Sequence, residues 1–383
     1  MTTYRIATIA GDGVGPEVVA AATTVVDAAG VRFGFVVDWS EIVAGGAAID
    51  TYGVAIRPED VEAAGATDAI LLGAVGGPKW SDPSAPVRPE QALFALRGGL
   101  ELFANLRPVA VHPAIGAASS PLRPELVAGV DLLIVRELTG GLYFGERTEA
   151  GADGPSRTAI DTLPYSESEI RRVVGLAYGL ARARRHKLTS VDKANVLATS
   201  RLWHRIVEEM RGEYPDVETS HQLVDSCAML LVKDPARFDV LVTENLFGDI
   251  LSDEASMIAG SLGLLPSASL GERRTEHGTF GLYEPIHGSA PRMTGLDIAN
   301  PIGTILSGAM LLRLSLGLED AATAVESAVS TALDDGFRTA DLVPAGADAG
   351  TDLRRVGTRE MTEAIVARIA IPEAARETAA ART

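Results

Sequence analysis

FDVLVTENLFGDILSDEASMIAG, residues 238–260, is the stretch from which the rest of the chain can be read. FDVLV is typical of a short buried strand and TENLFG of a turn at Gly248, and we expect a helix to begin at Asp249. On that helix Asp249 and Asp253 are four residues apart, so their carboxylates share one face. The pair can be a solvated first turn, which helix electrostatics favours. Its position after a strand and a turn, where α/β proteins bind ligands, instead favours a divalent cation that needs a third acid from elsewhere.

Length and composition indicate a globular enzyme. The chain has 383 residues, 46% of them hydrophobic and 22% charged, enough for two domains or one large α/β unit. The formal net charge of −17 argues against nucleic acid or an anionic membrane as a partner, because both would repel it. No segment reaches the ~18 uninterrupted apolar residues of a membrane span, and no secretion signal is expected. Cys227 is the only cysteine, which fits a reducing cytoplasm.

The order of the predicted elements is that of a mostly parallel sheet. Residues 11–17, GDGVGPE, follow a strand and enter a helix with Pro16 near its start. No third glycine follows at the spacing of the dinucleotide fingerprint, so a tight βα turn without a ligand is the simpler interpretation. Residues 33–42 and 68–75 are expected to be further strands, with helical sequence between them. The tail from Pro372 onward is expected to fray.

Three arginines lie near the ends of predicted elements: Arg97, Arg107 and Arg136. A single arginine is most often a surface charge, but three in such positions favour bidentate binding of carboxylates by the planar guanidinium. Residues 141–169 have no apolar face of helical period and are expected to form a protruding loop or hairpin arm. Tyr143 begins this arm and could simply pack there.

Two further charged residues stand where strands meet helices. Lys193 follows a predicted strand among apolar residues, a setting that can lower the pKa of a lysine and suit it to base chemistry. Asp225 precedes an apolar helix and, taken alone, is a helix N-cap. With Asp249 and Asp253 it would complete a cation site of three carboxylates. The HGSAP loop, residues 287–291, is either a plain turn or a loop whose backbone N–H groups face a phosphate.

The chain as a whole resembles the β-decarboxylating dehydrogenases of the isocitrate/isopropylmalate dehydrogenase family. The resemblance covers residues 4–342 and rests on these motifs, in this order: GDGVGPEV, LLGAVGGPKW, ANLRP, VRELTGGLYFG, DKANVL, TENLFGDILSDEASMIAGSLG and GLYEPIHGSAP. It implies an α/β fold with a large twisted mixed sheet in two domains, isopropylmalate-dehydrogenase-like and not a Rossmann fold. Residues 1–103 and 260–383 would form the cofactor-binding domain. Residues 104–259 would form the substrate and dimerisation domain, with an arm near 139–165.

The resemblance also implies roles for individual residues. Lys193, from the neighbouring subunit of a homodimer with shared active sites, would be the general base, and Tyr143 the acid. A small dicarboxylate substrate would be bound by Arg97, Arg107, Arg136, Asp225, Glu90, Leu93 and Phe94. Mg²⁺ or Mn²⁺ would be bound by Asp225, Asp249 and Asp253. NAD would be bound by Glu284, His287, Gly288, Ser289, Ala290, Arg292 and Asn300.

The sequence before Arg97 is expected to select the substrate. Relatives that use isocitrate have a polar residue there for a third carboxylate, whereas this chain has Leu93 and Phe94, which favour an alkyl group. Glu90 would repel an extra carboxylate, so isopropylmalate is expected over isocitrate or tartrate. The family usually has a second leucine at the position of Phe94, so a paralogue acting on another alkyl- or aryl-malate is the alternative. A non-catalytic regulatory subunit is disfavoured, because the expected catalytic residues are all present.

The cofactor expectation has one departure from the family pattern. NAD-dependent members have an acid after HGSAP that bonds the adenosine ribose, and this chain has Arg292 there. An arginine beside a 2′-phosphate is typical of NADP binding, so NADP is possible. Ala340 and Pro344, however, occupy positions where NADP-using relatives have basic or tyrosine residues. NAD therefore remains the expected cofactor.

Overall fold

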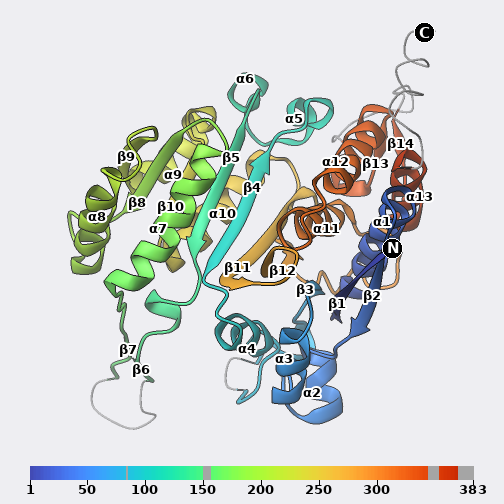
Figure 1. The fold of residues 1–383 in the computed structure, drawn as a ribbon, viewed down its shortest axis with the longest axis horizontal. Helices are drawn as coiled ribbons and strands as arrows, with labels where there is room; N and C mark the ends of the chain where they lie inside the picture. The colour runs from blue at the N-terminus through green and yellow to red at the C-terminus, as the bar shows by residue number, and fades with distance from the viewer. Residues whose placement is uncertain (83–84, 150–156, 344–352, 370–383) are drawn as a thin grey trace.

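One twisted mixed sheet of ten strands runs through the computed structural model, which describes residues 1–82, 85–149, 157–343 and 353–369 (Figure 1). In sheet order the strands are β2 (Phe35–Glu41), β1 (Thr2–Gly11), β3 (Ala69–Ala74), β12 (Thr279–Pro285), β11 (Pro266–Arg274), β4 (Ala104–Ala110), β5 (Asp131–Glu137), β10 (Val240–Thr243), β8 (Lys187–Asp192) and β9 (Glu218–Leu223).

The sheet consists of two parallel groups joined by antiparallel strands. β2, β1, β3 and β12 are mutually parallel, and so are β5, β10, β8 and β9. The pairs β12–β11, β11–β4 and β4–β5 between these groups are antiparallel. A Rossmann sheet has no such antiparallel centre, so the predicted mixed sheet that is not a Rossmann fold is confirmed.

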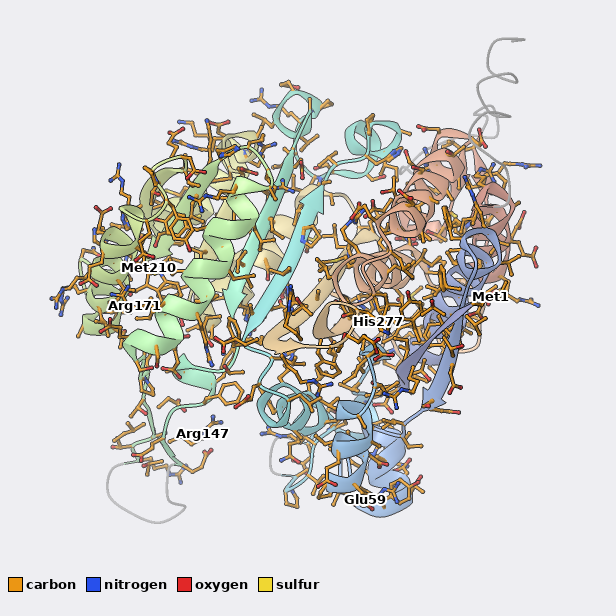
Figure 2. All side chains as sticks on the ribbon, viewed as in Figure 1. Met1, Glu59, Arg147, Arg171, Met210 and His277 are labelled. Carbon is orange, nitrogen blue, oxygen red and sulfur yellow. The ribbon has the colours of Figure 1, made fainter. Side chains whose placement is uncertain are left out.

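Helices cover the sheet on both sides of this centre (Figure 1). In chain order they are α1 (Gly15–Phe33), α2 (Gly46–Tyr52), α3 (Pro58–Gly65), α4 (Gln91–Gly99), α5 (Pro113–Ser119), α6 (Pro124–Val127), α7 (Glu167–Arg182), α8 (Ala198–Arg211), α9 (Val224–Lys233), α10 (Asn245–Ile258), α11 (Ile302–Leu314), α12 (Glu319–Asp334) and α13 (Thr358–Ile369). α1, α11, α12 and α13 pack together, and α7 packs on α8. Figure 2 places Arg171 of α7 and Met210 of α8 close together, and Arg171 also binds Glu209 of α8 at 2.5 Å.

The core is continuous across the sheet centre. One buried cluster includes Leu71 of β3, Leu106 of β4 and Leu241 of β10, so it joins strands from both parallel groups. The division into residues 1–103 with 260–383 and residues 104–259 stays a proposal. Its boundary runs between the antiparallel strands β11 and β4.

The helix that carries the aspartates begins earlier than the sequence suggested. α10 starts at Asn245, because the side chain of Glu244 accepts hydrogen bonds from the backbone N–H of Leu246 at 3.1 Å and of Phe247 at 2.8 Å. This N-cap satisfies the first helical donors. The expected turn at Gly248 and the expected helix start at Asp249 are therefore wrong, while the expected strand is confirmed as β10.

The GDGVG segment is a tight turn between β1 and α1, as predicted. Gly13 has a φ of +63°, and a Cβ there would lie 2.0 Å from the carbonyl oxygen of Ser289. The buried carboxylate of Asp12 accepts hydrogen bonds from the backbone N–H of Gly46 and Gly76, both at 2.8 Å. The turn thus contacts three neighbouring loops, at Gly46, Gly76 and Ser289.

The predicted arm contains a short hairpin. β6 (Arg147–Thr148) pairs antiparallel with β7 (Ile160–Asp161). Residues 150–156 of the arm, Pro344, and the tail from Pro372 onward lie outside the described residues. Within the described parts of the chain, no helix has both the length and the apolar character needed to cross a membrane.

Candidate active site

A cavity of about 360 Å³ opens between the two strand groups. Its lining comes from the end of β3, from α4, β4, β5 and α10, and from the end of β12. Eleven of the predicted site residues line it: Glu90, Leu93, Phe94, Arg97, Arg107, Arg136, Tyr143, Asp249, Glu284, His287 and Gly288. The structure therefore brings together residues that are up to 198 positions apart in the chain (288 minus 90).

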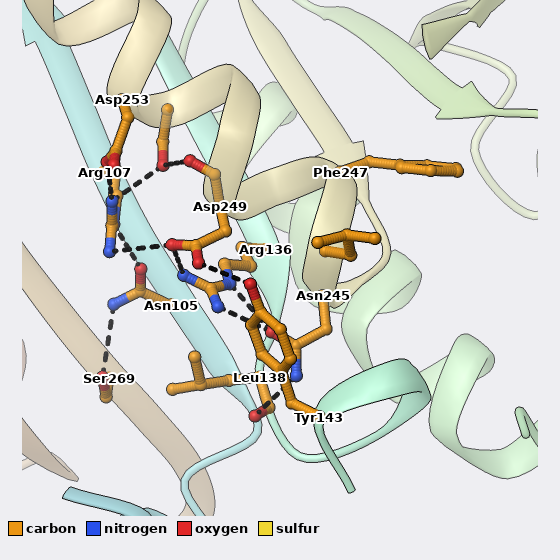
Figure 3. A network of polar contacts seen from close by, with 12 residues as sticks. Asn105, Arg107, Arg136, Leu138, Tyr143, Asn245, Phe247, Asp249, Asp253 and Ser269 are labelled. Carbon is orange, nitrogen blue, oxygen red and sulfur yellow. Dashed lines mark hydrogen bonds and ion pairs between the residues drawn. The ribbon is translucent and has the colours of Figure 1, made fainter. Parts of the chain in front are cut away.

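Arg136 is the most deeply placed charge in the cavity, at 3% exposure. Its Nε and Nη2 donate to the Oδ1 of Asn245 at 2.9 and 2.7 Å, and its Nη1 donates to Asp249 (Figure 3). Asn245 in turn donates to the backbone oxygens of Leu138 and Gly140. Burial lowers the pKa of Arg136 to about 10, which leaves the guanidinium charged at neutral pH. Asn245 was not predicted as a site residue.

Arg107 connects the two aspartates of α10. Its Nη1 donates to Oδ1 of Asp253 at 3.0 Å and to Oγ of Ser252 at 2.8 Å, and its Nη2 is 3.9 Å from Oδ1 of Asp249. Its Nε donates to Oδ1 of Asn105 at 2.8 Å. The shared helix face of the two aspartates is thus confirmed. Asp253 lies at the edge of this network and does not line the cavity. Arg107 was expected near an element end but sits inside β4.

Tyr143 completes the group of donors around Asp249. Its hydroxyl donates to Oδ2 of Asp249 at 2.9 Å, and its ring centroid is 5.7 Å from the guanidinium carbon of Arg136. Burial, this hydrogen bond and the charge of Asp249 raise the pKa of Tyr143 to about 12. The phenol therefore keeps its proton at neutral pH and can donate it.

On the side near β12, the cavity has one guanidinium nitrogen and one imidazole nitrogen without hydrogen-bond partners among the described residues. Arg97 donates from Nη2 to Oε1 of Glu284 at 2.7 Å, while its Nε is buried and unpartnered. His287 places Nδ1 2.9 Å from the backbone oxygen of Gly288, and its Nε2 is buried and unpartnered. Burial lowers the pKa of His287, so its ring is neutral near pH 7. Both nitrogens therefore have unused hydrogen-bonding capacity.

Lys193 and Asp225 lie elsewhere. Lys193 follows β8, and Asp225 is in the first turn of α9. The Nζ of Lys193 is 2.6 Å from Oδ1 of Asp225, and this hydrogen bond lowers the pKa of the Asp225 carboxyl. Neither residue lines the cavity of its own chain.

Four of the residues expected to bind the cofactor also lie outside the cavity lining. The backbone oxygen of Ser289 accepts from the N–H of Val14 at 2.8 Å, and Ala290 has a φ of +40°. Arg292 is exposed and donates no hydrogen bond to a described residue. Asn300 accepts at its Oδ1 from the N–H of Ile302 at 3.0 Å, near the start of α11.

Comparison with known proteins agrees with this fold and cavity. The family model described as isocitrate/isopropylmalate dehydrogenase matches residues 5–365. The chain is 54% identical to a 3-isopropylmalate dehydrogenase of Anaeromyxobacter dehalogenans, over 96% of this chain and 99% of the relative. It is 53% identical to a 3-isopropylmalate dehydrogenase of Geobacillus kaustophilus, over 95% of each chain.

Solved structures give the same result. An isocitrate dehydrogenase from Methylococcus capsulatus superimposes with a TM-score of 0.81 at 36% identity, covering 96% of this chain and 99% of that one. A β-decarboxylating dehydrogenase from Thermococcus kodakarensis gives a TM-score of 0.74 at 36% identity, covering 96% of each. The fold and the relatives together define a β-decarboxylating dehydrogenase. The chain belongs to the isocitrate/isopropylmalate dehydrogenase family.

Proposed function

We propose that this chain oxidises and decarboxylates 3-isopropylmalate to 4-methyl-2-oxopentanoate, a step of leucine biosynthesis, with NAD and with Mg²⁺ or Mn²⁺. The observation that carries the proposal is the convergence of Arg107, Arg136 and Tyr143 on Asp249 in a cavity of about 360 Å³. The names of the relatives with 52–54% identity support the same substrate.

The donor set fits a hard divalent cation. Asp249 and Asp253 supply carboxylate oxygens from one face of α10, and Mg²⁺ and Mn²⁺ prefer oxygen ligands. Asp249 cannot share the same oxygen fully with Arg136 and with a cation. We therefore propose that Arg107 and Arg136 turn to the substrate carboxylates when the two aspartates act as ligands, since the guanidinium fork suits both partners.

The opposite side of the cavity fits a nicotinamide cofactor. The unpartnered Nε2 of His287 can bond a polar group of the ligand. A Cβ on Gly288 would meet no atom within 4 Å, so the backbone there is open to a close approach. Glu284 reaches the same cavity and is held by Arg97 at 2.7 Å.

The side chains divide the proton transfers between them. When bound, the nicotinamide accepts a hydride from the substrate and the cation stabilises negative charge on oxygen. Lys193 of the partner subunit accepts the proton of the substrate hydroxyl, acting as general base. The arginines hold the carboxylates in place while one of them leaves as CO₂. Tyr143, whose phenol carries its proton at neutral pH, then donates a proton to the substrate carbon.

We propose a homodimer in which each active site uses both chains. Lys193 and Asp225 do not line the cavity of their own chain, yet they form a charged pair of the kind this chemistry needs. Large apolar side chains are exposed on the adjacent helices, namely Met229 and Val232 of α9 and Ile250 and Met257 of α10. Burial of these side chains against a second copy would stabilise such a dimer.

A mixed dimer tests the shared site directly. Lys193→Met and Asp249→Asn each inactivate the homodimer under this proposal. In a mixed dimer of the two variants, one active site combines the intact Asp249 of one chain with the intact Lys193 of the other. An equimolar mixture that is allowed to exchange chains should recover roughly a quarter of the wild-type turnover. Recovery of no activity would place both residues in one chain.

The substrate is tested by steady-state kinetics on a panel of 2- and 3-substituted malates with Mg²⁺. We expect 3-isopropylmalate to have the highest kcat/KM, because Leu93 and Phe94 offer an apolar wall while Glu90 repels a third carboxylate. Phe94 is 44% exposed and packs edge-on against Phe144 at 5.9 Å between ring centroids. This aromatic pair supports a second candidate, a larger alkyl- or aryl-malate. A clear preference for such a substrate, or for isocitrate, would overturn the first choice.

NAD and NADP are compared in the same assay. We expect NAD to be preferred, and Arg292→Asp to increase that preference, because an acid beside the ribose excludes a 2′-phosphate. A large preference of the wild type for NADP would contradict this choice. If Arg292→Asp leaves cofactor preference unchanged, Arg292 has no part in it.

We also propose a cytoplasmic location. The one cysteine, Cys227, is buried, and burial raises the pKa of its thiol to about 12, as suits a structural thiol in a reducing compartment. Cell fractionation with antibody detection tests this, and recovery in an extracytoplasmic fraction would refute it.

A further inference from the structure

A group of metal-ligating side chains lies at the β9 edge of the sheet, outside the cavity. Asp192 ends β8, His204 lies on α8 and His221 lies on β9. One potential ligand atom from each falls within 4.8 Å of the others. None of the three lines the proposed active site, so the reaction proposed above does not account for them.

One ring nitrogen of His221 is hydrogen-bonded to a carboxylate, and the other has no hydrogen-bond partner among the described residues. Its Nε2 is 2.8 Å from Oε1 of Glu208, a carboxylate that accepts hydrogen bonds when ionised, so Nε2 carries a proton. Its Nδ1 is buried without a hydrogen-bond partner among the described residues and is 3.8 Å from Oδ2 of Asp192. A carboxylate that fixes a histidine tautomer in this way is the usual support of a metal-binding imidazole.

His204 provides the third ligand. Its Nδ1 is 3.1 Å from Oδ2 of Asp192, and its ring centroid is 3.7 Å from that of His221. The side chain is 42% exposed, so the ring can turn without disturbing the core. His204 and Glu208 are four residues apart on α8 and therefore reach His221 from the same helix face.

We propose that Asp192, His204 and His221 bind a borderline transition-metal ion, with Zn²⁺ as the reference ion, and that Glu208 supports the site through His221. In a tetrahedral zinc site with bonds of ~2.0–2.1 Å, neighbouring ligand atoms are about 3.3 Å apart. The Oδ2 of Asp192 is 3.1 Å from Nδ1 of His204 and 3.8 Å from Nδ1 of His221, and these two distances lie on either side of that value. Three protein ligands leave a fourth position for water. Two imidazoles and one carboxylate favour Zn²⁺ over Mg²⁺, which prefers oxygen ligands only.

The site is placed to affect the segment that carries Lys193. The second oxygen of Asp192, Oδ1, accepts from the backbone N–H of Ala194 at 2.8 Å, so Lys193 lies in a turn held by the same carboxylate. A bound ion would therefore tie α8 and β9 to this turn. We expect zinc to raise the melting temperature of the protein for this reason.

The test is a zinc titration of chelator-treated, full-length protein in excess Mg²⁺, followed by calorimetry and by metal analysis after dialysis. We expect one zinc ion per chain in this site. His204→Asn and His221→Asn should each weaken zinc binding at least tenfold, and Glu208→Ala should weaken it about tenfold because it removes the support of His221. His204→Asn changes a half-exposed residue, so it keeps the test valid if His221→Asn fails to fold.

Two controls separate this site from other histidines and from the proposed Mg²⁺ site. His186→Gln changes an exposed histidine beside Asp216 and should leave zinc binding unchanged. Asp249→Asn should also retain the zinc site while turnover is lost, so failure of one proposal is visible without failure of the other. Absence of zinc binding in the wild type, or binding that His204→Asn and His221→Asn leave unchanged, overturns the proposal.

Discussion

Asp249 is surrounded by several partners from its own chain, whereas Asp225 has one charged partner among the described residues. Asp249 receives Arg136 and Tyr143 and has Arg107 at 3.9 Å, all from its own chain. Asp225, whose side chain is 59% exposed, pairs only with Lys193 among the described residues. The first carboxylate stands in a network that one chain builds alone. The second is a charged pair on the surface, which the proposed homodimer would bring to the cavity of another copy.

Removing the base should have the largest effect. We expect Lys193→Met to lower kcat by about 10²–10⁴-fold, the usual contribution of a general base. Its effect on the melting temperature should be small, because exposed ion pairs such as Lys193–Asp225 contribute little to stability. Lys187→Met is the matched control, since Lys187 is an exposed lysine at the start of β8, the strand that Lys193 follows, and is paired with Glu218 at 3.7 Å. An unchanged kcat in Lys193→Met would show that Lys193 is not the general base.

Removing the buried guanidinium of Arg136 should affect stability as well as turnover. Arg136→Met leaves Asp249 and the Oδ1 of Asn245 without their guanidinium partner, and we expect a loss of about 3 kcal/mol in the free energy of unfolding. Arg292→Met, at an exposed position, should change it by less than about 0.5 kcal/mol. Urea denaturation measures both. Equal losses in the free energy of unfolding for the two substitutions would show that the contacts around Asp249 do not stabilise the fold.

The smallest effect is expected at high pH. The pKa of Tyr143 is raised from 10.0 to about 12 in the folded chain, so its stabilisation is complete below pH 10 and is lost as the pH rises toward 12. The melting temperature of the wild type should therefore fall more steeply than that of Tyr143→Phe between pH 10 and about 12. Because the group is only partly buried, we expect a difference of at most about 2 °C. Parallel curves for the two proteins would show that the Tyr143 phenol is not bonded to Asp249 in solution.

Local sequence patterns predicted the parts of the site that depend on spacing. Asp249 and Asp253 share a helix face because four residues make about one helical turn, and this holds wherever the helix begins. The start of α10 was missed because its N-cap is Glu244, whereas Ser, Thr, Asp and Asn are the common N-cap residues. Asn245, which positions Arg136, therefore looked like part of a turn.

Long-range contacts were beyond local patterns. Ser252 of α10 binds Arg107 of β4 across 145 positions of the chain (252 minus 107). The ligand group at the β9 edge joins Asp192, His204 and His221, which share no short motif. The mixed sheet was implied only by family resemblance. The antiparallel pairing of β11 with β4 at its centre was not predicted, because strand neighbours far apart in the chain leave no periodic signal.

The turn at Asp12 limits how this protein can change through evolution. A Cβ on Gly45 would lie 2.6 Å from the Oδ2 of Asp12, and one on Gly13 would lie 2.0 Å from the backbone oxygen of Ser289. A substitution in any of these loops therefore needs a matched change in its neighbour. A single substitution at Gly13 or at Gly45 is therefore closed to selection. Single substitutions remain open at exposed positions such as Arg292.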